Sequence, residues 1–160
     1  MSKELVISAQ AEQVRIAVLD DGRLMEFHQD TENDGFAVGD IYLGKIKKLA
    51  PSLNATFVDI GYSKDAFLHY HDLGPQVRSS NAYNKIVANK TYKTEKLKSF
   101  RMEKPIEKDG LITEIFAPGD SVLVQITKEP IHTKGPRITS EISIAGRYLV
   151  LVPFSDRVSI

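Results

Sequence analysis

Apolar and polar residues alternate along several short runs of this 160-residue chain, a pattern typical of half-buried β-strands. Residues 4–8 (ELVIS) form the first run, and residues 14–28 (VRIAVLDDGRLMEFH) contain two more. The dipeptide Asp21–Gly22 divides this second stretch, and its residues readily adopt the positive φ angles of a tight hairpin turn. A hairpin of this size buries too little apolar surface to be a domain by itself.

A second group of strand-like runs begins at Gly39 and is punctuated by short turns. Its members are DIYLGKIKKLA (40–50), NATFVDIGY (54–62), DAFLHYH (65–71), GDSVLVQITKE (119–129) and GPRITSEIS (135–143). Five short β segments with glycine punctuation predict a mainly β fold around a small five-stranded antiparallel barrel. The last stretch, residues 145–160, is also strand-like and stops without a turn or capping signal, so we expect the chain to be cut from a longer one.

A long interruption separates the third barrel run from the fourth, at about residues 74–117. Eight basic and three acidic residues lie between Lys85 and Lys108. A connection of this length is unusual in a compact barrel, and we favour a solvated, poorly ordered loop. The alternative is a basic arm with Tyr92 and Phe100 that touches nucleic acid, because a mobile basic loop also attracts phosphate.

Strand alternation predicts which way two phenylalanines point. Phe57 shares a face with Asp59, and an unpaired carboxylate is very rarely buried, so that face should be the wet one. The same alternation turns Phe67 and His69 outward on the next strand. The inward set is then Thr56, Val58, Ile60, Ala66 and Leu68.

Two outward aromatic rings on neighbouring strands are what a stacking platform for single-stranded nucleic acid requires. Lysines near the platform would add phosphate contacts, and the candidates are Lys45, Lys47, Lys48, Lys128 and Lys134. An alternative is that barrel curvature or a bulge at Gly61 turns one ring inward. A second functional hypothesis is a barrel used for protein contact or assembly, which would be favoured if Lys128 and Lys134 lay on the face opposite Phe57.

Composition places the chain among soluble globular proteins, with 42% hydrophobic and 26% charged residues. No apolar run approaches the ~20 residues of a membrane helix, and no secretory segment opens the chain, so we expect a cytoplasmic protein without a membrane partner. The absence of cysteine excludes disulfides and cysteine metal sites. The net charge of zero hides an asymmetry, with nine acidic and three basic residues up to Asp40, against twelve and eighteen from Ile41 onward. A polyanionic partner for the second part is compatible with this separation.

The order of these runs resembles a known family. GDIYLGKI, LNATFVDIGYSKDAFLH, GDSVLVQITKE and KGPRITSEIS together resemble an S1 RNA-binding domain, a variant of the oligonucleotide-binding (OB) barrel. More narrowly, KEPIHTKGPRIT and ISIAGRYLVLVP resemble the N-terminal part of bacterial ribonuclease G and its relative ribonuclease E. This is the most specific part, because generic S1 domains do not have it. The resemblance covers nearly the whole chain except the basic interruption.

The resemblance implies a mosaic of three parts. Residues 1–38 would be a partial RNase H-like subdomain, residues 39–139 the S1 barrel with its basic insertion at about 74–117, and residues 140–160 the start of a region that senses a 5′-monophosphate. The family cleaves single-stranded RNA with Mg²⁺ held by carboxylates, and cysteines share Zn²⁺ between subunits of a homo-oligomer. Both sets of ligands belong to a later subdomain, so we expect this segment to bind single-stranded RNA, to need no cofactor and to contain no catalytic residue. An active nuclease is a third hypothesis.

The resemblance also assigns individual residues. The family's RNA-binding positions fall on Phe57, Phe67, Lys128 and Lys134, to which we add Lys45 for its place near the platform. The sensor begins at positions that match Gly146 and Val150, and its phosphate-gripping arginine and threonine would come after Ile160. Ile60 stands where some relatives have an aromatic residue, which reduces the expected stacking surface.

Other polar groups have simpler explanations. His69 and His71 share a strand face and are side chains of a metal-binding type, but no third ligand is evident, and ordinary polar residues fit better. Asp20–Asp21 fits turn chemistry better than a catalytic pair. His28 and His132 have no serine or cysteine at a recognised spacing. We therefore predict no metal site and no catalytic site in this segment.

Overall fold

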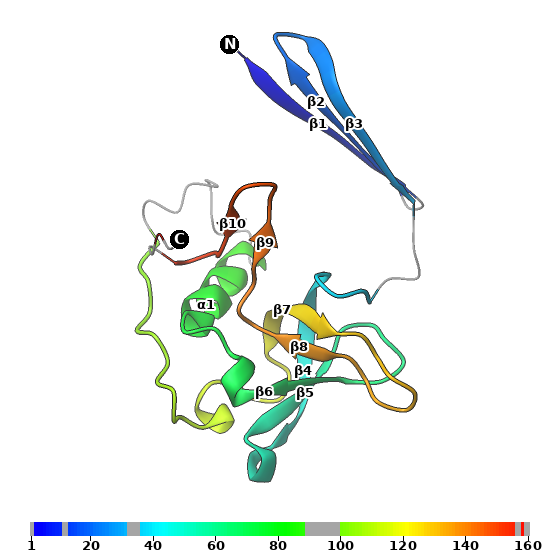
Figure 1. The fold of residues 1–160 in the computed structure, drawn as a ribbon. Coiled ribbons are helices and arrows are strands. Elements are labelled where there is room, and N and C mark those ends of the chain that lie inside the picture. The colour runs from blue at the N-terminus through cyan, green and yellow to red at the C-terminus, as the bar shows by residue number, and fades with distance from the viewer. Residues whose placement is uncertain (1, 11–12, 32–35, 89–99, 156–157, 159–160) are drawn as a thin grey trace. The chain divides into compact units, whose positions relative to one another are not determined.

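A computed structural model describes residues 2–10, 13–31, 36–88, 100–155 and 158 of the chain (Figure 1). It divides the chain into two compact units, Met1–Gly35 and Phe36–Ile160. Each unit is described by itself below.

The first unit is a three-stranded antiparallel sheet in the order β1-β2-β3. Its strands are β1 (Lys3–Gln10), β2 (Gln13–Asp20) and β3 (Arg23–Thr31). Asp21 and Gly22 join β2 to β3 with φ angles of 46° and 75°, which confirms the hairpin predicted from this dipeptide. Many of the apolar side chains of the sheet remain on the surface; Leu5, Ile7 and Phe27 are each more than half exposed.

The second unit is built on a closed five-stranded barrel in the order β4-β5-β6-β8-β7. Its strands are β4 (Ile41–Ala50), β5 (Ala55–Asp59), β6 (Ala66–His69), β7 (Ser121–Lys128) and β8 (Arg137–Thr139). The predicted barrel is confirmed, but the prediction that it is antiparallel throughout is wrong, because β6 and β8 run parallel. Strand direction cannot alternate around a closed ring with an odd number of strands, so at least one pair must be parallel.

The parallel pair closes at Gly135–Pro136, immediately before β8. The Phe67 N–H donates a hydrogen bond of 2.9 Å to the Pro136 carbonyl oxygen. A Cβ atom on Gly135 would overlap the Asp65 carbonyl oxygen, so only glycine lets this segment come so close to the start of β6. The barrel therefore depends on one residue without a side chain at its closing seam.

Apolar side chains from every barrel strand fill the interior. Ile46, Val58, Leu68, Val124 and Ile138 are at most 1% exposed. The polar Thr56 is also fully buried, and its hydroxyl donates a 2.9 Å hydrogen bond to the Lys48 carbonyl oxygen. A buried hydroxyl with a partner costs little, which reconciles this residue with an apolar interior.

The interruption at about 74–117 is partly helical. Helix α1 (Val77–Ala88) follows Gly74–Pro75 and contacts β7. Val77 is buried, as are Ile112 and Phe116 close to the other end of the interruption. The favoured prediction of a solvated, poorly ordered loop is therefore wrong for the described residues of this segment, because these apolar side chains join the barrel core. Tyr92 and four of the eight basic residues lie outside the described residues.

The interruption leaves the barrel and returns at nearly the same place. The Ile106 N–H donates to the Pro75 carbonyl oxygen at 2.9 Å, and the Glu103 N–H donates to the Ser79 hydroxyl oxygen at 3.0 Å. Asn54, at φ 46°, holds residues 110–112 near the end of the interruption. Its side-chain amide donates to the Gly110 carbonyl oxygen at 2.9 Å and accepts from the peptide N–H of residue 112 at 2.7 Å. These contacts hold the start and the end of the interruption against the barrel.

The C-terminal part forms a small two-stranded sheet of β9 (Ile144–Ala145) and β10 (Val150–Leu151). Beyond it, the ring of Phe154 lies 5.7 Å from that of Tyr83 on α1 and 5.9 Å from that of Phe100. Within the described residues, three short 3₁₀ helices complete the unit, at Pro51–Leu53, Tyr70–Asp72 and Ile112–Glu114. Among the described residues, no helix is both long enough and apolar enough to cross a bilayer.

Candidate nucleic-acid interface

The two phenylalanines lie opposite each other on β5 and β6, on the outside of the barrel. Their ring centroids are 5.8 Å apart in an edge-to-face arrangement, and both side chains are partly exposed. Val58 and Leu68, their neighbours along each strand, are completely buried. Alternation therefore predicted both faces correctly, and no bulge turns either ring inward.

Cations flank this aromatic pair on both sides. Lys48 on β4 lies opposite Phe57, and Arg137 on β8 lies beside Phe67. Residues paired across neighbouring strands share a face, so Lys48, Phe57, Phe67 and Arg137 form one continuous row over four strands of the barrel. We call these four residues the outer row.

Arg137 was missed in the sequence analysis. Ile138 is fully buried, so alternation along the short strand RIT would have turned Arg137 outward. What the sequence alone does not reveal is that this strand lies beside Phe67. The guanidinium is held by Asp72 through hydrogen bonds of 2.8 to 3.0 Å to both carboxylate oxygens, which fixes its orientation.

The other predicted lysines occupy different places. Lys128 on β7 lies opposite Arg137 and is exposed, so it shares the face of the outer row, one strand beyond Arg137. Lys134 is an exposed residue of the loop that joins β7 to β8, where its N–H bonds the carbonyl oxygen of residue 131. Lys45 is exposed on β4 opposite Asp59. Neither Lys134 nor Lys45 belongs to the outer row itself.

Lys47 is engaged in an ion-pair network at one end of the aromatic pair. Its ammonium group lies 2.9 Å from the Asp65 carboxylate and 3.6 Å from that of Asp59. The hydrogen bond from Lys47 to Asp65, together with the charges of both carboxylates, raises the pKa of Lys47. A hydrogen bond from the Gly61 N–H, followed by the charge of Lys47, lowers the pKa of Asp59. Lys47 and Asp59 are therefore charged at neutral pH, and all three side chains are already partnered.

The residues expected to begin a 5′-phosphate sensor lie in the small C-terminal sheet. The Gly146 N–H donates to the Leu149 carbonyl oxygen at 2.8 Å, closing the turn between β9 and β10. Val150 lies in β10, opposite Ala145, and is 60% exposed. Neither residue is on the barrel, so the structure does not bring them into the outer row.

Two histidines continue the aromatic surface beyond Phe67. His69 follows Phe67 on the same face of β6, and His71 lies in the 3₁₀ helix Tyr70–Asp72. The Nδ1 atom of His69 accepts a hydrogen bond of 3.1 Å from the His71 N–H, so this nitrogen is used within the protein. Among the described residues, no group of three or more histidine or carboxylate side chains is arranged to hold a metal ion.

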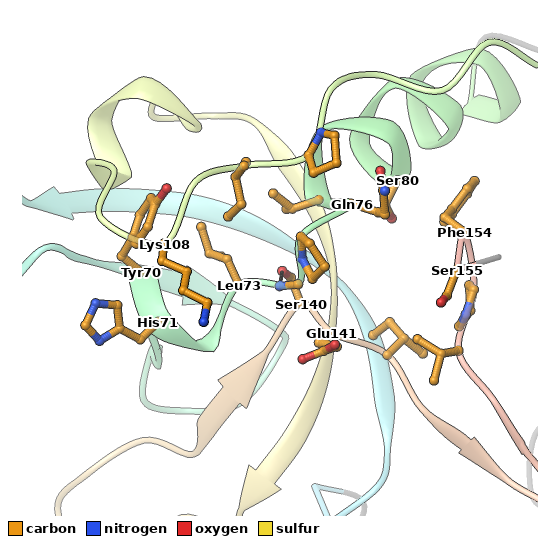
Figure 2. A pocket seen from close by; sticks show the side chains of 18 of the residues that line it. Tyr70, His71, Leu73, Gln76, Ser80, Lys108, Ser140, Glu141, Phe154 and Ser155 are labelled. Carbon is orange, nitrogen blue, oxygen red and sulfur yellow. Dashed lines mark hydrogen bonds between the residues drawn. The ribbon is translucent and has the colours of Figure 1, made fainter. Parts of the chain in front are cut away.

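A cavity of about 810 Å³ lies between α1, residues 105–109 and the C-terminal segment (Figure 2). His71 and Lys108 both line it, at the end where Tyr70 stands. The Tyr70 hydroxyl donates a 2.6 Å hydrogen bond to the Glu107 carbonyl oxygen, and burial raises the pKa of Tyr70. His71, the second of the two histidines, therefore lies at one end of the cavity.

Known proteins match the chain closely enough to place it in a family. It is 34% identical over 160 residues to ribonuclease G of Escherichia coli, a match that covers 100% of this chain and 29% of that relative. It is 35% identical over 162 residues to ribonuclease E of Nostoc sp., a match that covers 100% of this chain and 19% of that relative. By homology, the chain is a segment of a ribonuclease G/E family protein. Ribonuclease E of Synechocystis sp. is 37% identical over 124 residues, which are 77% of this chain and 14% of that relative.

These matches confirm the resemblance to the ribonuclease G/E family. The chain spans less than a third of the length of the curated relatives that it matches. No family model matches it. The closed five-stranded barrel is consistent with the S1 domain that the resemblance to ribonuclease G/E implies.

Proposed function

We propose that this segment binds single-stranded RNA on the outer face of its barrel, within a longer ribonuclease G/E-type protein that processes or degrades RNA. The observation that supports this is the outer row, in which two partly exposed aromatic rings lie between Lys48 and Arg137. The composition of the row matches what an unpaired strand offers, because bases stack on rings while phosphates meet cations.

The two kinds of contact have different expected magnitudes. Stacking of a base on an aromatic side chain contributes about 1–3 kcal/mol per base and needs no particular sequence. Each phosphate neutralised on a single strand adds about −0.7 to the slope of log affinity against log salt. Two phosphates at Lys48 and Arg137 therefore give a slope of about −1.4, or about sevenfold weaker binding between about 50 and 200 mM salt.

RNA cleavage is part of the proposal for the longer protein only. The Mg²⁺ and Zn²⁺ that the resemblance implies need carboxylate and cysteine ligands, and this chain contains no cysteine. The described residues likewise offer no suitable cluster of metal ligands. We therefore assign this segment the task of holding RNA, and we include Mg²⁺-dependent cleavage, a shared Zn²⁺ and a homo-oligomer in the cytoplasm as properties of the full-length enzyme.

The test is titration of the full chain into a fluorescent oligouridylate of about ten nucleotides, followed by anisotropy at several salt concentrations. The double variant Phe57→Ala/Phe67→Ala should bind at least about fivefold more weakly at low salt. Phe27→Ala is the matched control, because it removes the same side chain from an exposed position in the other unit. It should bind like the parent chain.

Absence of binding at low salt would overturn the proposal and favour a barrel used for protein contact. Equal affinity of the parent chain and the double phenylalanine variant would remove the outer row from the site. Incubation of the RNA with the chain and Mg²⁺ should leave it intact, and cleavage would contradict the assignment of chemistry to another part of the protein.

A further inference from the structure

The aromatic surface does not end with the two phenylalanines. The Phe67 ring lies 6.4 Å from that of His69, and the His69 ring lies 5.0 Å from that of His71. With the 5.8 Å contact between Phe57 and Phe67, each of the four rings lies within 6.4 Å of the next, at interplanar angles from 37° to 72°. His69 is partly exposed and His71 is exposed. Both imidazoles are therefore accessible to a ligand that already lies on the phenylalanines.

The backbone that presents the two histidines is firmly anchored. The Tyr70 N–H donates to the Asn54 carbonyl oxygen at 2.8 Å, and the Thr139 hydroxyl donates to the Asp72 carbonyl oxygen at 2.6 Å. The Asp72 carboxylate is held in turn by Arg137 of the outer row. Groups that are fixed before binding lose less conformational freedom when a ligand arrives, which favours a binding role over an accidental exposure.

The hydrogen bond within the pair also determines how His69 meets a ligand. Its Nδ1 atom accepts from the His71 N–H, so in the neutral ring the proton is on Nε2. Nε2 is then a donor, in a ring that also has a stacking face. A base can use the face and a phosphate or ribose oxygen can use the donor.

The opposite end of the phenylalanine pair differs in chemistry. Asp59 follows Phe57 on the same face, and Asp65 precedes Phe67 on the same face. Their carboxylates are both bonded to Lys47, and they provide neither a ring for a base nor attraction for a phosphate. A strand that leaves the phenylalanines therefore meets aromatic rings in one direction. In the other direction it meets the paired charges of Lys47, Asp59 and Asp65 beside the exposed Lys45.

We propose that the RNA strand leaves the phenylalanine pair over His69 and His71, whose imidazoles take the next two bases, and continues toward Lys108 at the mouth of the cavity. This inference rests on the proposed function and adds the direction of the RNA strand and the length of the surface that binds it. His71 and Lys108 line the same end of that cavity, so a phosphate beyond the fourth base meets a cation there (Figure 2).

The test compares substitutions that separate the rings from the backbone they support. In His69→Asn the new Oδ1 atom takes the place of Nδ1 and keeps the hydrogen bond from residue 71, while the ring is lost. His69→Asn/His71→Ala should therefore keep the parent thermal midpoint yet bind the ten-nucleotide oligouridylate at least about fivefold more weakly. His69→Phe/His71→Phe restores the stacking faces and should bind within about twofold of the parent.

A second measurement needs no substitution. Addition of the oligouridylate to the parent chain should shift the carbon-bound imidazole proton resonances of His69 and His71, with His28 in the other unit as an unshifted reference. One outcome refutes the path over His69 and His71 and leaves the proposed function standing. In that outcome the parent chain binds, the phenylalanine variant binds more weakly, the histidine variant binds like the parent, and these resonances stay in place. If the parent chain does not bind at all, the proposed function itself fails.

Discussion

Gly135 offers a sharp test of how the barrel closes. In Gly135→Ala, the new methyl group would overlap the Asp65 carbonyl oxygen, which belongs to the backbone and cannot rotate away. The segment before β8 must then move from the start of β6, and the 2.9 Å hydrogen bond between Phe67 N–H and the Pro136 oxygen lengthens or breaks. The substitution thus acts on the closing seam while leaving the core side chains unchanged.

The expected loss of stability follows from these two effects. Forcing an extra methyl group into a closely packed site costs about 1–3 kcal/mol. Loss of one intramolecular hydrogen bond adds about 1 kcal/mol. A total of about 2–4 kcal/mol in the free energy of unfolding corresponds to a fall of about 10 °C in the thermal midpoint for a unit of this size.

Thermal and urea unfolding followed by circular dichroism measure this loss directly. Gly146→Ala is the control, because its methyl group would lie 3.2 Å from the Leu149 carbonyl oxygen and needs only a small local shift. RNA binding should weaken together with stability in Gly135→Ala, since Arg137 moves relative to Phe67. A midpoint within about 1 °C of the parent would refute the account of closure, because such a value leaves no room for the overlap.

Three further predictions concern the outer row and its supports. Arg137→Gln should weaken RNA binding and make the salt slope shallower by about 0.7, whereas Asp72→Asn, which keeps the guanidinium, should preserve the slope. Asn54→Ala should lower the unfolding free energy by about 2–4 kcal/mol, because two hydrogen bonds are lost and alanine is strained at φ 46°; Asn54→Gly, which relieves the strain alone, should be less destabilised in urea. Burial raises the pKa of Tyr70, so the stability that this group contributes is present below its unfolded pKa of about 10 and is lost as the pH rises through the folded pKa. The urea midpoint of the parent should therefore fall more steeply above about pH 10 than that of Tyr70→Phe.

The orientation of the two phenylalanines was predictable because it depends on local sequence alone. A carboxylate at Asp59 and an imidazole at His69 mark the wet face of each strand, and the alternate residues are apolar. The hairpin at Asp21–Gly22 was predictable for the same reason, since the dipeptide itself favours the required φ angles.

Other features depend on contacts that are distant in sequence. The parallel pairing of β6 with β8 joins residues 67 and 137, and it is this pairing that brings Arg137 to the aromatic rings. Helix α1 has a weak signal of its own, because serine and asparagine occupy four of its twelve positions, and its place is set by the burial of Val77 and Ser79. The length and basic composition of the interruption suggested a loop, and tertiary packing decided otherwise.

The paired anchors of the long excursion have a consequence for how such a segment can diversify. Residues 75 and 106 are hydrogen-bonded to each other, as are residues 79 and 103. These two pairs fix where the chain leaves the barrel and where it returns, independently of the length of chain between residues 79 and 103. Helix α1 and the ring of Phe100 lie between these anchors and pack within the unit, so a change in chain length that keeps those contacts would still reach the barrel through the same entry and exit.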